Sequence, residues 1–293
     1  MIDLHCHSTC SDGSLEPIEL LRKAEQLGLT YFSISDHNNA RAYEAIADPA
    51  VRSIFSGKIV RGIELTTYLD GQMIEILGYG IDPKKLEPTI QKIRERGSSQ
   101  RLMELLYKEY RARGVYLPFP MEGYDPKVYL NPRRYVFKQL VDFPQNHRFF
   151  LDFEAHTDTP LTYYRQELYN EKSPLYIDCS CLYVSAPEII DAIHQAGGLA
   201  FMAHSFCYTD AIHGHLDEIT DRLPLDGLEC CYSSFTAEQT ESIIALCKRK
   251  GLLMSGGSDF HGKLRPAIEL GIGTGNLNIP DSLVADWIEP YTF

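Results

Sequence analysis

The sequence has no excess of basic residues, and this absence limits the kind of partner that the protein can bind. Its 293 residues include 28 Lys and Arg against 40 Asp and Glu, which gives a formal net charge of −12. Duplex nucleic acid is bound largely through neutralisation of its phosphates by Lys and Arg, so such a partner is not expected. A small anionic substrate, held in a local cleft or by metal ions, fits this composition better.

The sequence also has no apolar run long enough to span a bilayer, and Met1-Ile2-Asp3-Leu4 shows no basic and apolar leader. Membrane association is therefore not expected, and the expected location is the cytoplasm. The eight cysteines are scattered, and Cys179-Ser180-Cys181 does not have the spacing of a zinc knuckle. This favours reduced, buried thiols over a disulfide framework or a structural zinc site built from cysteines.

Strand-like apolar segments alternate with helical segments in the first and last thirds of the chain. Helical spacing of apolar residues is seen at 189–196, after the capping sequence Ser185 to Glu188, and at 237–250, after Thr236 and Gln239. About seven strands in all are predicted, at residues 2–7, 30–35, 58–63, 73–79, 199–203, 227–232 and 252–255. This alternation predicts an α/β fold built from βα units.

The middle of the chain departs from this alternation. Residues 83–113 form a long charged helical stretch, a region rich in Pro and Tyr follows, and the βα pattern returns near Pro174. We therefore predict a discontinuous main domain of residues 1–82 and 175–293. Residues 83–174 are predicted to form an inserted helical cap subdomain.

Clusters of residues that commonly bind metal ions directly follow four of the strand-like segments. In a parallel α/β barrel the strand ends converge on one face, so residues remote in sequence meet there. In an extended segment side chains alternate between faces, so two ligands separated by one residue point the same way. Imidazole and carboxylate ligands without paired thiolates suit Zn, Mn or Fe, and predict a multinuclear catalytic metal site. The clusters are His5-Cys6-His7 with Asp12, Asp36-His37, His204, and Ser258-Asp259-Phe260-His261.

These residues carry a resemblance to a known family, the PHP (polymerase and histidinol phosphatase) family, in their order, spacing and position at strand ends. The match extends over residues 1–82 and about 175–275 and resembles most the stand-alone metal-dependent phosphoesterases, which carry a helical insertion. The resemblance implies a distorted (β/α)7 barrel with an α-helical insertion and two or three divalent metal ions, Mn, Zn or Fe. The matching segments are Asp3-Leu4-His5-Cys6-His7-Ser8, Ser11-Asp12-Gly13, Ser35-Asp36-His37, Gly62-Ile63-Glu64, Met202-Ala203-His204 and Gly257-Ser258-Asp259-Phe260-His261.

The resemblance also implies which residues hold each ion. The family usually has a histidine in the fourth strand where this chain has Glu75. Glutamate can bind a hard cation through oxygen, so the second site either survives with an altered metal preference or is empty. The implied first set is His5, His7, Glu64 and Asp259; Glu64 bridges to the second ion, which His204 and Glu75 also bind; Asp12, His37 and His261 hold the third.

The reaction implied by the resemblance is hydrolysis of the phosphate ester of a small metabolite, foremost a nucleotide or sugar phosphate, by a metal-activated water. Catalytic roles are implied for Asp259, His204 and His261, and the leaving oxygen could take its proton from either histidine or from a metal-bound water. Candidate phosphate clamps are Arg133 and Arg134, where relatives show Arg-Pro-His, and Lys263 and Arg265 after the last ligand pair.

Three alternatives stay open: an exonuclease acting on short oligonucleotides, a cyclic phosphodiesterase, and a PHP binding module that has lost its metals. The oligomeric state stays open as well.

Overall fold

The computed structural model of the chain describes residues 1–129 and 131–293, and for residue 161 its backbone alone. The chain forms two compact units. Unit 1 comprises Met1–Thr67, Ile74–Gln91 and Ala186–Phe293. Unit 2 comprises Tyr68–Met73 and Lys92–Ser185.

The strands form two sheets, with the orders β1-β2-β3 and β4-β5-β6-β7-β8. The pairs within the first sheet are parallel, and so are β6 with β7 and β7 with β8. The α/β fold predicted from the sequence is confirmed. The strands are β1 (Ile2–Asp3), β2 (Tyr31–Phe32), β3 (Lys58–Ile59), β4 (Gly62–Leu69), β5 (Gln72–Tyr79), β6 (Leu199–Met202), β7 (Gly227–Tyr232) and β8 (Leu253–Gly257).

The described strands do not close into the (β/α)7 barrel that was expected. The ladders β1–β2 and β2–β3 are only two residues long, although isolated backbone hydrogen bonds such as that from Ser35 N–H to Cys6 O (2.8 Å) continue beyond them. Three backbone hydrogen bonds connect the segment after β1 to the segment around β8: Leu4 N–H to Gly256 O (3.1 Å), Asp259 N–H to His5 O (2.7 Å) and His7 N–H to Phe260 O (2.9 Å). They form an isolated parallel bridge between Cys6 and Phe260 and not a ladder.

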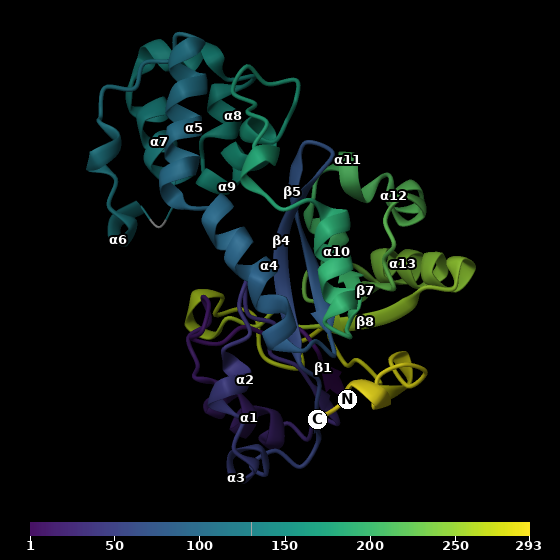
Figure 1. The fold of residues 1–293 in the computed structure, drawn as a ribbon. Coiled ribbons are helices and arrows are strands. Elements are labelled where there is room, and N and C mark those ends of the chain that lie inside the picture. The colour runs from purple at the N-terminus through teal and green to yellow at the C-terminus, as the bar shows by residue number, and fades with distance from the viewer. Residues whose placement is uncertain (130) are drawn as a thin grey trace. The chain divides into compact units, whose positions relative to one another are not determined.

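The prediction of one strand over residues 58–63 is wrong in its extent. This segment is divided into β3 and β4, and β4 continues to Leu69 and turns back into β5 (Figure 1). Asp70 and Gly71 at this turn have φ values of 45° and 81°, as the primed turns of two-residue hairpins require. Because a hairpin takes the place of a βα unit here, β5 runs antiparallel to β6. The Asp-Gly pair is the sequence signal for this turn.

Two helices of unit 1 pack on the second sheet. Helix α10 (Ala186–Gln195) contacts β6, and α13 (Ala237–Lys250) contacts β7 (Figure 1). The predicted capping of α13 is confirmed, because Thr236 and Gln239 form a reciprocal capping box. The other helices of this unit are α1 (Pro17–Gln26), α2 (Ala42–Ala45), α3 (Pro49–Arg52), α11 (Asp210–His213) and α12 (Leu216–Arg222).

Unit 2 is mainly helical and has a core of its own. Helices α5 (Ser99–Ala112) and α7 (Pro132–Asp142) lie side by side and bury Leu106 and Tyr110, among others (Figure 1). Helix α4 (Pro83–Arg96) begins in unit 1 and ends in unit 2. The remaining helices are α6 (Pro126–Tyr129), α8 (Phe153–His156) and α9 (Pro160–Tyr163). Throughout the described chain, no helix has both the length and the hydropathy needed to cross a bilayer.

Candidate metal centre

A buried carboxylate ties the first ligand segment to the last. Asp3 Oδ1 accepts hydrogen bonds from the backbone N–H of His5 (3.2 Å) and of Ser258 (3.0 Å). Its Oδ2 accepts from the Ser258 hydroxyl (2.6 Å) and from Gly271 N–H (2.7 Å). Burial raises the pKa of Asp3, although these donors oppose the shift. Because the bonds fix both segments, His5 Nε2 lies 3.5 Å from Asp259 Oδ1.

A second buried carboxylate orders the loop after the first strand. Asp36 Oδ1 accepts from Ser8 N–H (2.8 Å) and from the Ser11 hydroxyl (2.6 Å), while its Oδ2 accepts from the Ser8 hydroxyl (2.6 Å). These bonds place the following loop, which carries Asp12, beside the end of the second strand. His37, the next residue after Asp36, pairs with Glu64 in a parallel bridge.

All nine ligands expected from the sequence lie in one region of unit 1. They fall into four overlapping groups, and within each group the possible ligand atoms lie within 4.8 Å of one another. The groups differ in detail from the expected sets, since His37 belongs to two of them and His204 lies with His5 and Asp259. The groups are His7, Asp12, His37 and His261; His5, His7 and Glu64; His5, His204 and Asp259; and His37, Glu64 and Glu75.

Glu64 lies at the centre of the cluster and faces four imidazoles. Its Oε1 is 3.0 Å from His204 Nε2 and 3.4 Å from His5 Nε2. Its Oε2 is 3.0 Å from His37 Nδ1 and 3.4 Å from His7 Nε2. A carboxylate with each oxygen facing a different pair of imidazoles has the geometry of a bridging ligand.

The donor atoms of the cluster fit divalent metal ions. Nε2 of His5, His7 and His261 and Oε2 of Glu64 are buried and have no hydrogen-bond partner among the described residues. Buried polar atoms are rarely left without a partner unless an ion or ligand supplies one. His261 Nδ1 is engaged with the carbonyl of Asp259 (2.8 Å), which directs its Nε2 into the cluster.

The pKa values reflect a balance between burial and charge. Burial lowers the pKa of His5, but the carboxylates of Glu229 and Glu64 outweigh it and raise the pKa well above its ordinary value. Burial and the neighbouring His37 lower the pKa of His7 to about 4. Burial raises the pKa of Glu64, but His5 and His37 hold it well below its usual range. Protons on some of these imidazoles therefore offset the buried carboxylates and must leave when metal ions bind.

Asp259 is held by residues on two sides. Its Oδ2 accepts from the Tyr232 hydroxyl (2.7 Å) and from the Arg265 guanidinium, so Oδ1 faces His7 Nε2 at 3.0 Å. Its φ of 56° lies in the left-handed region, which is unfavourable for a residue with a side chain. The structure thus places Arg265 against a predicted ligand, whereas Lys263 is exposed in the turn that follows His261.

A model described as the PHP domain matches residues 3–219. This chain belongs to the PHP domain family. The family predicted from the ligand motifs is thereby confirmed, and so is the predicted class of enzyme, a metal-dependent phosphoester hydrolase.

Three curated relatives share between 27% and 29% identity with this PHP protein. A 5'-3' exoribonuclease of Haemophilus influenzae is 27% identical over 97% of both chains. A 3',5'-nucleoside bisphosphate phosphatase of Chromobacterium violaceum is 29% identical over 89% of this chain and 87% of the relative. A phosphoribosyl 1,2-cyclic phosphate 1,2-diphosphodiesterase of Eggerthella lenta is 27% identical over 89% of this chain and 94% of the relative.

Two solved structures share the fold. An amidohydrolase from Chromobacterium violaceum with bound sulfate and no metal has a TM-score of 0.66 and 24% identity, covering 100% of this chain and 97% of that one. A Bifidobacterium adolescentis protein whose structure carries the name metal-dependent phosphoesterase has a TM-score of 0.64 and 22% identity, covering 98% and 95%. Both likenesses support an α/β fold of the PHP type.

Glu75 lies inside the PHP centre, at the position where this chain departs from the family pattern. Its Oε2 is 3.3 Å from His204 Nε2, and its Oε1 is 3.4 Å from His37 Nδ1. The hydroxyl of Tyr208, a half-buried tyrosine that sequence reasoning missed, accepts the backbone N–H of Glu75 (2.8 Å). The carboxylate therefore has the reach of a ligand.

Arg133 and Arg134 stand in the first turn of α7, in unit 2. The Arg133 guanidinium donates to the Tyr183 hydroxyl (2.9 Å) and lies 5.9 Å from the centre of the Tyr169 ring. Its Nε is buried without a hydrogen-bond partner, and no carboxylate of the described residues pairs with it. Arg134 is exposed.

Glu229 and Tyr232, both on β7, are two further residues of the PHP centre that sequence reasoning missed. Glu229 is fully buried, and its carboxylate contacts His5 and His204. A signal for it exists in the sequence, because an acidic residue inside the apolar strand Gly227–Tyr232 is rarely buried without a partner.

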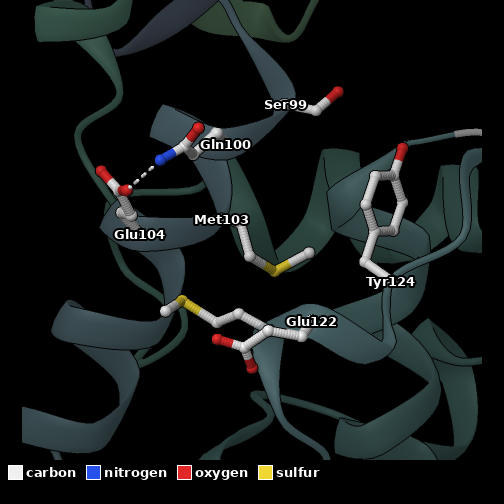
Figure 2. Close-up of a pocket in the computed structure, with 7 residues that line it drawn as sticks. Ser99, Gln100, Met103, Glu104, Glu122 and Tyr124 are labelled. Carbon is white, nitrogen blue, oxygen red and sulfur yellow. Dashed lines mark hydrogen bonds between the residues drawn. The ribbon is translucent and has the colours of Figure 1, made fainter.

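Unit 2 contains a hollow of about 400 Å³ beside α5 (Figure 2). Met103, Met121 and Tyr124 line it together with Glu104 and Glu122, and Gln100 Nε2 donates to Glu104 Oε1 (2.9 Å). Both carboxylates are exposed, and the hollow contains none of the predicted ligands. It is therefore separate from the PHP centre.

Proposed function

We propose that this PHP protein hydrolyses the phosphate ester of a small phosphorylated metabolite, foremost a nucleotide or sugar phosphate, with two or three divalent ions. The observation that carries this proposal is the convergence of nine imidazole and carboxylate side chains, with Glu64 at their centre. Bound there, Mn, Zn or Fe would act as Lewis acids that neutralise phosphoryl oxygens and activate water.

The residues around these ligands orient them. Tyr232 and Arg265 both occupy Asp259 Oδ2, which leaves Oδ1 directed at the cluster. The proton for the leaving oxygen is proposed to come from His204, from His261 or from a metal-bound water. In the metal-free protein burial lowers the pKa of His204, but Tyr208 and a hydrogen bond with Glu64 raise it well above its ordinary value, and a metal ion bound to this imidazole would displace its proton.

The finer features expected of the fold stay proposals. A distorted barrel is supported by the single backbone bonds that connect the segment after β1 to the segment around β8. An inserted subdomain at residues 83–174 and cytoplasmic location are proposed from the sequence alone.

A second candidate, 5'-3' exonuclease action on short RNA, is favoured by the match to the Haemophilus influenzae exoribonuclease over 97% of both chains. The net charge of −12 counts against it, since an oligonucleotide needs a basic path for its further phosphates.

Phosphate release from a substrate panel tests these candidates. The panel comprises nucleoside monophosphates and bisphosphates, sugar phosphates, cyclic phosphates and short oligonucleotides, each with Mn²⁺ or Zn²⁺, beside a His5→Ala variant. Release from small esters that is lost in the variant is the expected result. Stepwise shortening of oligonucleotides would shift the assignment to an exonuclease. A protein without metal-dependent turnover would be a binding module.

Replacing Glu75 by His is expected to shift the metal preference from Mn²⁺ towards Zn²⁺. The group of His37, Glu64 and Glu75 contains two carboxylates, and oxygen donors favour harder ions than imidazole does. We expect the ratio of Zn²⁺ to Mn²⁺ affinities to rise about tenfold, which corresponds to ~1.4 kcal/mol. Competition titration with a chromophoric chelator measures this ratio, and an unchanged ratio would show that Glu75 is not a ligand.

Replacing Arg133 by Gln is expected to raise KM about tenfold or more with little change in kcat. We propose, as the resemblance implies, that the Arg133 guanidinium binds a phosphate group of the substrate, and hydrogen bonds to charged groups contribute about 1.5–3 kcal/mol. The matched control is Arg134→Gln, one residue along the helix and exposed, with an expected change within about twofold. Equal effects of the two substitutions on KM would count against this role.

A further inference from the structure

Glu229 lies on β7 between two segments of the metal centre and uses both of its carboxylate oxygens. Oε1 is 2.8 Å from His5 Nδ1, and Oε2 accepts the backbone N–H of His204 (2.8 Å). The side chain is fully buried, so no solvent molecule can substitute for either contact without rearrangement. One residue therefore joins two predicted ligands that are 199 positions apart in the sequence.

We propose that Glu229 is a positioning residue, which fixes His5 in the tautomer that can bind a metal ion and holds the backbone of His204 in its strained conformation. This inference rests on the proposed function, because it concerns the same metal centre. It adds to the metal centre a residue that is not itself a metal ligand.

The tautomer of His5 follows from the chemistry of its partner. A carboxylate only accepts hydrogen bonds, so His5 Nδ1 must carry the proton that Glu229 Oε1 receives. In a neutral imidazole the other nitrogen then has a free lone pair. That nitrogen, Nε2, is buried without a hydrogen-bond partner and faces Glu64 Oε1 at 3.4 Å and Asp259 Oδ1 at 3.5 Å. A carboxylate behind a ligating histidine is a known way to orient the ring and raise its basicity.

The backbone of His204 needs support because its φ is 24° and its ψ is 53°. These values lie in the left-handed region, where a residue other than glycine is strained. The bond from its N–H to Glu229 Oε2 opposes relaxation of this backbone. The same bond therefore helps to keep His204 Nε2 3.0 Å from Glu64 Oε1.

Glutamine cannot replace Glu229 at both contacts, although its shape is nearly the same. If its NH₂ group faces His204, two N–H donors oppose each other. If its NH₂ group faces His5, Nδ1 must accept, and the imidazole proton moves to Nε2, where it blocks the lone pair that a metal ion needs. Either orientation disturbs one predicted ligand, whereas a purely structural role for Glu229 would not change the tautomer of His5.

The first experiment is titration of the purified, metal-free protein with Mn²⁺ by calorimetry. Glu229→Gln is expected to weaken Mn²⁺ binding about 10- to 100-fold. The matched control is Glu167→Gln, in unit 2, where none of the predicted ligands lies. Glu167 is also buried, and its Oε1 is close to a histidine Nδ1, that of His156 (2.7 Å), and accepts the N–H of Leu151 (2.9 Å). This variant is expected to bind Mn²⁺ like the wild type.

A second experiment needs no variant and decides the matter even if Glu229→Gln fails to fold. Nitrogen NMR of ¹⁵N-histidine-labelled wild-type protein loaded with Zn²⁺ is expected to show His5 protonated at Nδ1 and bound through Nε2. A proton on Nε2, or Mn²⁺ affinity of Glu229→Gln equal to that of the wild type, would overturn the inference while leaving the proposed function intact. A wild-type protein that binds neither Mn²⁺ nor Zn²⁺ would overturn both.

Discussion

Replacing Asp259 by Asn is expected to lower kcat by about 10³-fold, which corresponds to ~4 kcal/mol of lost transition-state stabilisation. Asp259 Oδ2 is occupied by the Tyr232 hydroxyl and the Arg265 guanidinium, and Oδ1 is 3.0 Å from His7 Nε2. An asparagine side chain has only one oxygen, which can face either the metal cluster or the Tyr232 and Arg265 donors. If its NH₂ group faces the cluster it cannot bind a metal ion, and if the group faces Arg265 it meets a cation with no acceptor to offer.

The measurement is steady-state phosphate release at saturating Mn²⁺, with circular dichroism and calorimetric metal binding recorded on the same preparation. Asp281→Asn serves as the control, because Asp281 is a partly exposed carboxylate of unit 1 that pairs with the N-terminal amine at 2.6 Å. Its kcat is expected to stay within about twofold of wild type. Retention of more than a tenth of the activity in folded Asp259→Asn would contradict the proposed ligand role.

Removing the metal ions is expected to lower the thermal stability, by an amount that grows as the pH rises from about 6 to 8. The pKa of His5 and that of His204 in the metal-free protein are raised, as described above. A raised pKa in the folded state contributes stability that is fully present below the unfolded value of about 6.5 and is lost as the pH rises through the folded pKa. Metal binding instead requires deprotonated imidazoles, so the protons of the metal-free site oppose it more strongly at pH 6 than at pH 8.

Both effects have the same sign, so the difference between the metal-bound and metal-free proteins widens with pH. A metal ion at a free concentration of 100 to 1,000 times its Kd adds about 2.7–4.1 kcal/mol to the free energy of unfolding. Thermal unfolding with chelator, and again after addition of Mn²⁺, measures the difference at each pH. Glu167→Gln is expected to keep the full pH-dependent shift. A Tm difference that is constant or shrinks with rising pH would contradict the expected linkage.

Parts of the fold followed from short-range patterns. Thr236 and Gln239 cap α13 as the sequence predicted, because a capping box is formed by residues three positions apart. The hairpin through Asp70 and Gly71 was missed, although its signal is equally local. Short-range patterns could not predict whether the sheet closes into a barrel. Closure depends on pairing between distant segments such as those around Leu4 and Gly256, which are joined here by isolated backbone hydrogen bonds.

The sequence by itself determined the family, the reaction class and the ligand types of this protein, because those depend on residue identity and on spacing within short motifs. The nine predicted ligands come together as a cluster only in the folded chain, and the tertiary structure decided how they do so. Glu64 lies between four imidazoles, and Glu75 comes within reach of His37 and His204. Only the fold could assign Glu229 to His5, since hydrogen bonds between residues 224 positions apart leave no periodicity or spacing in the chain.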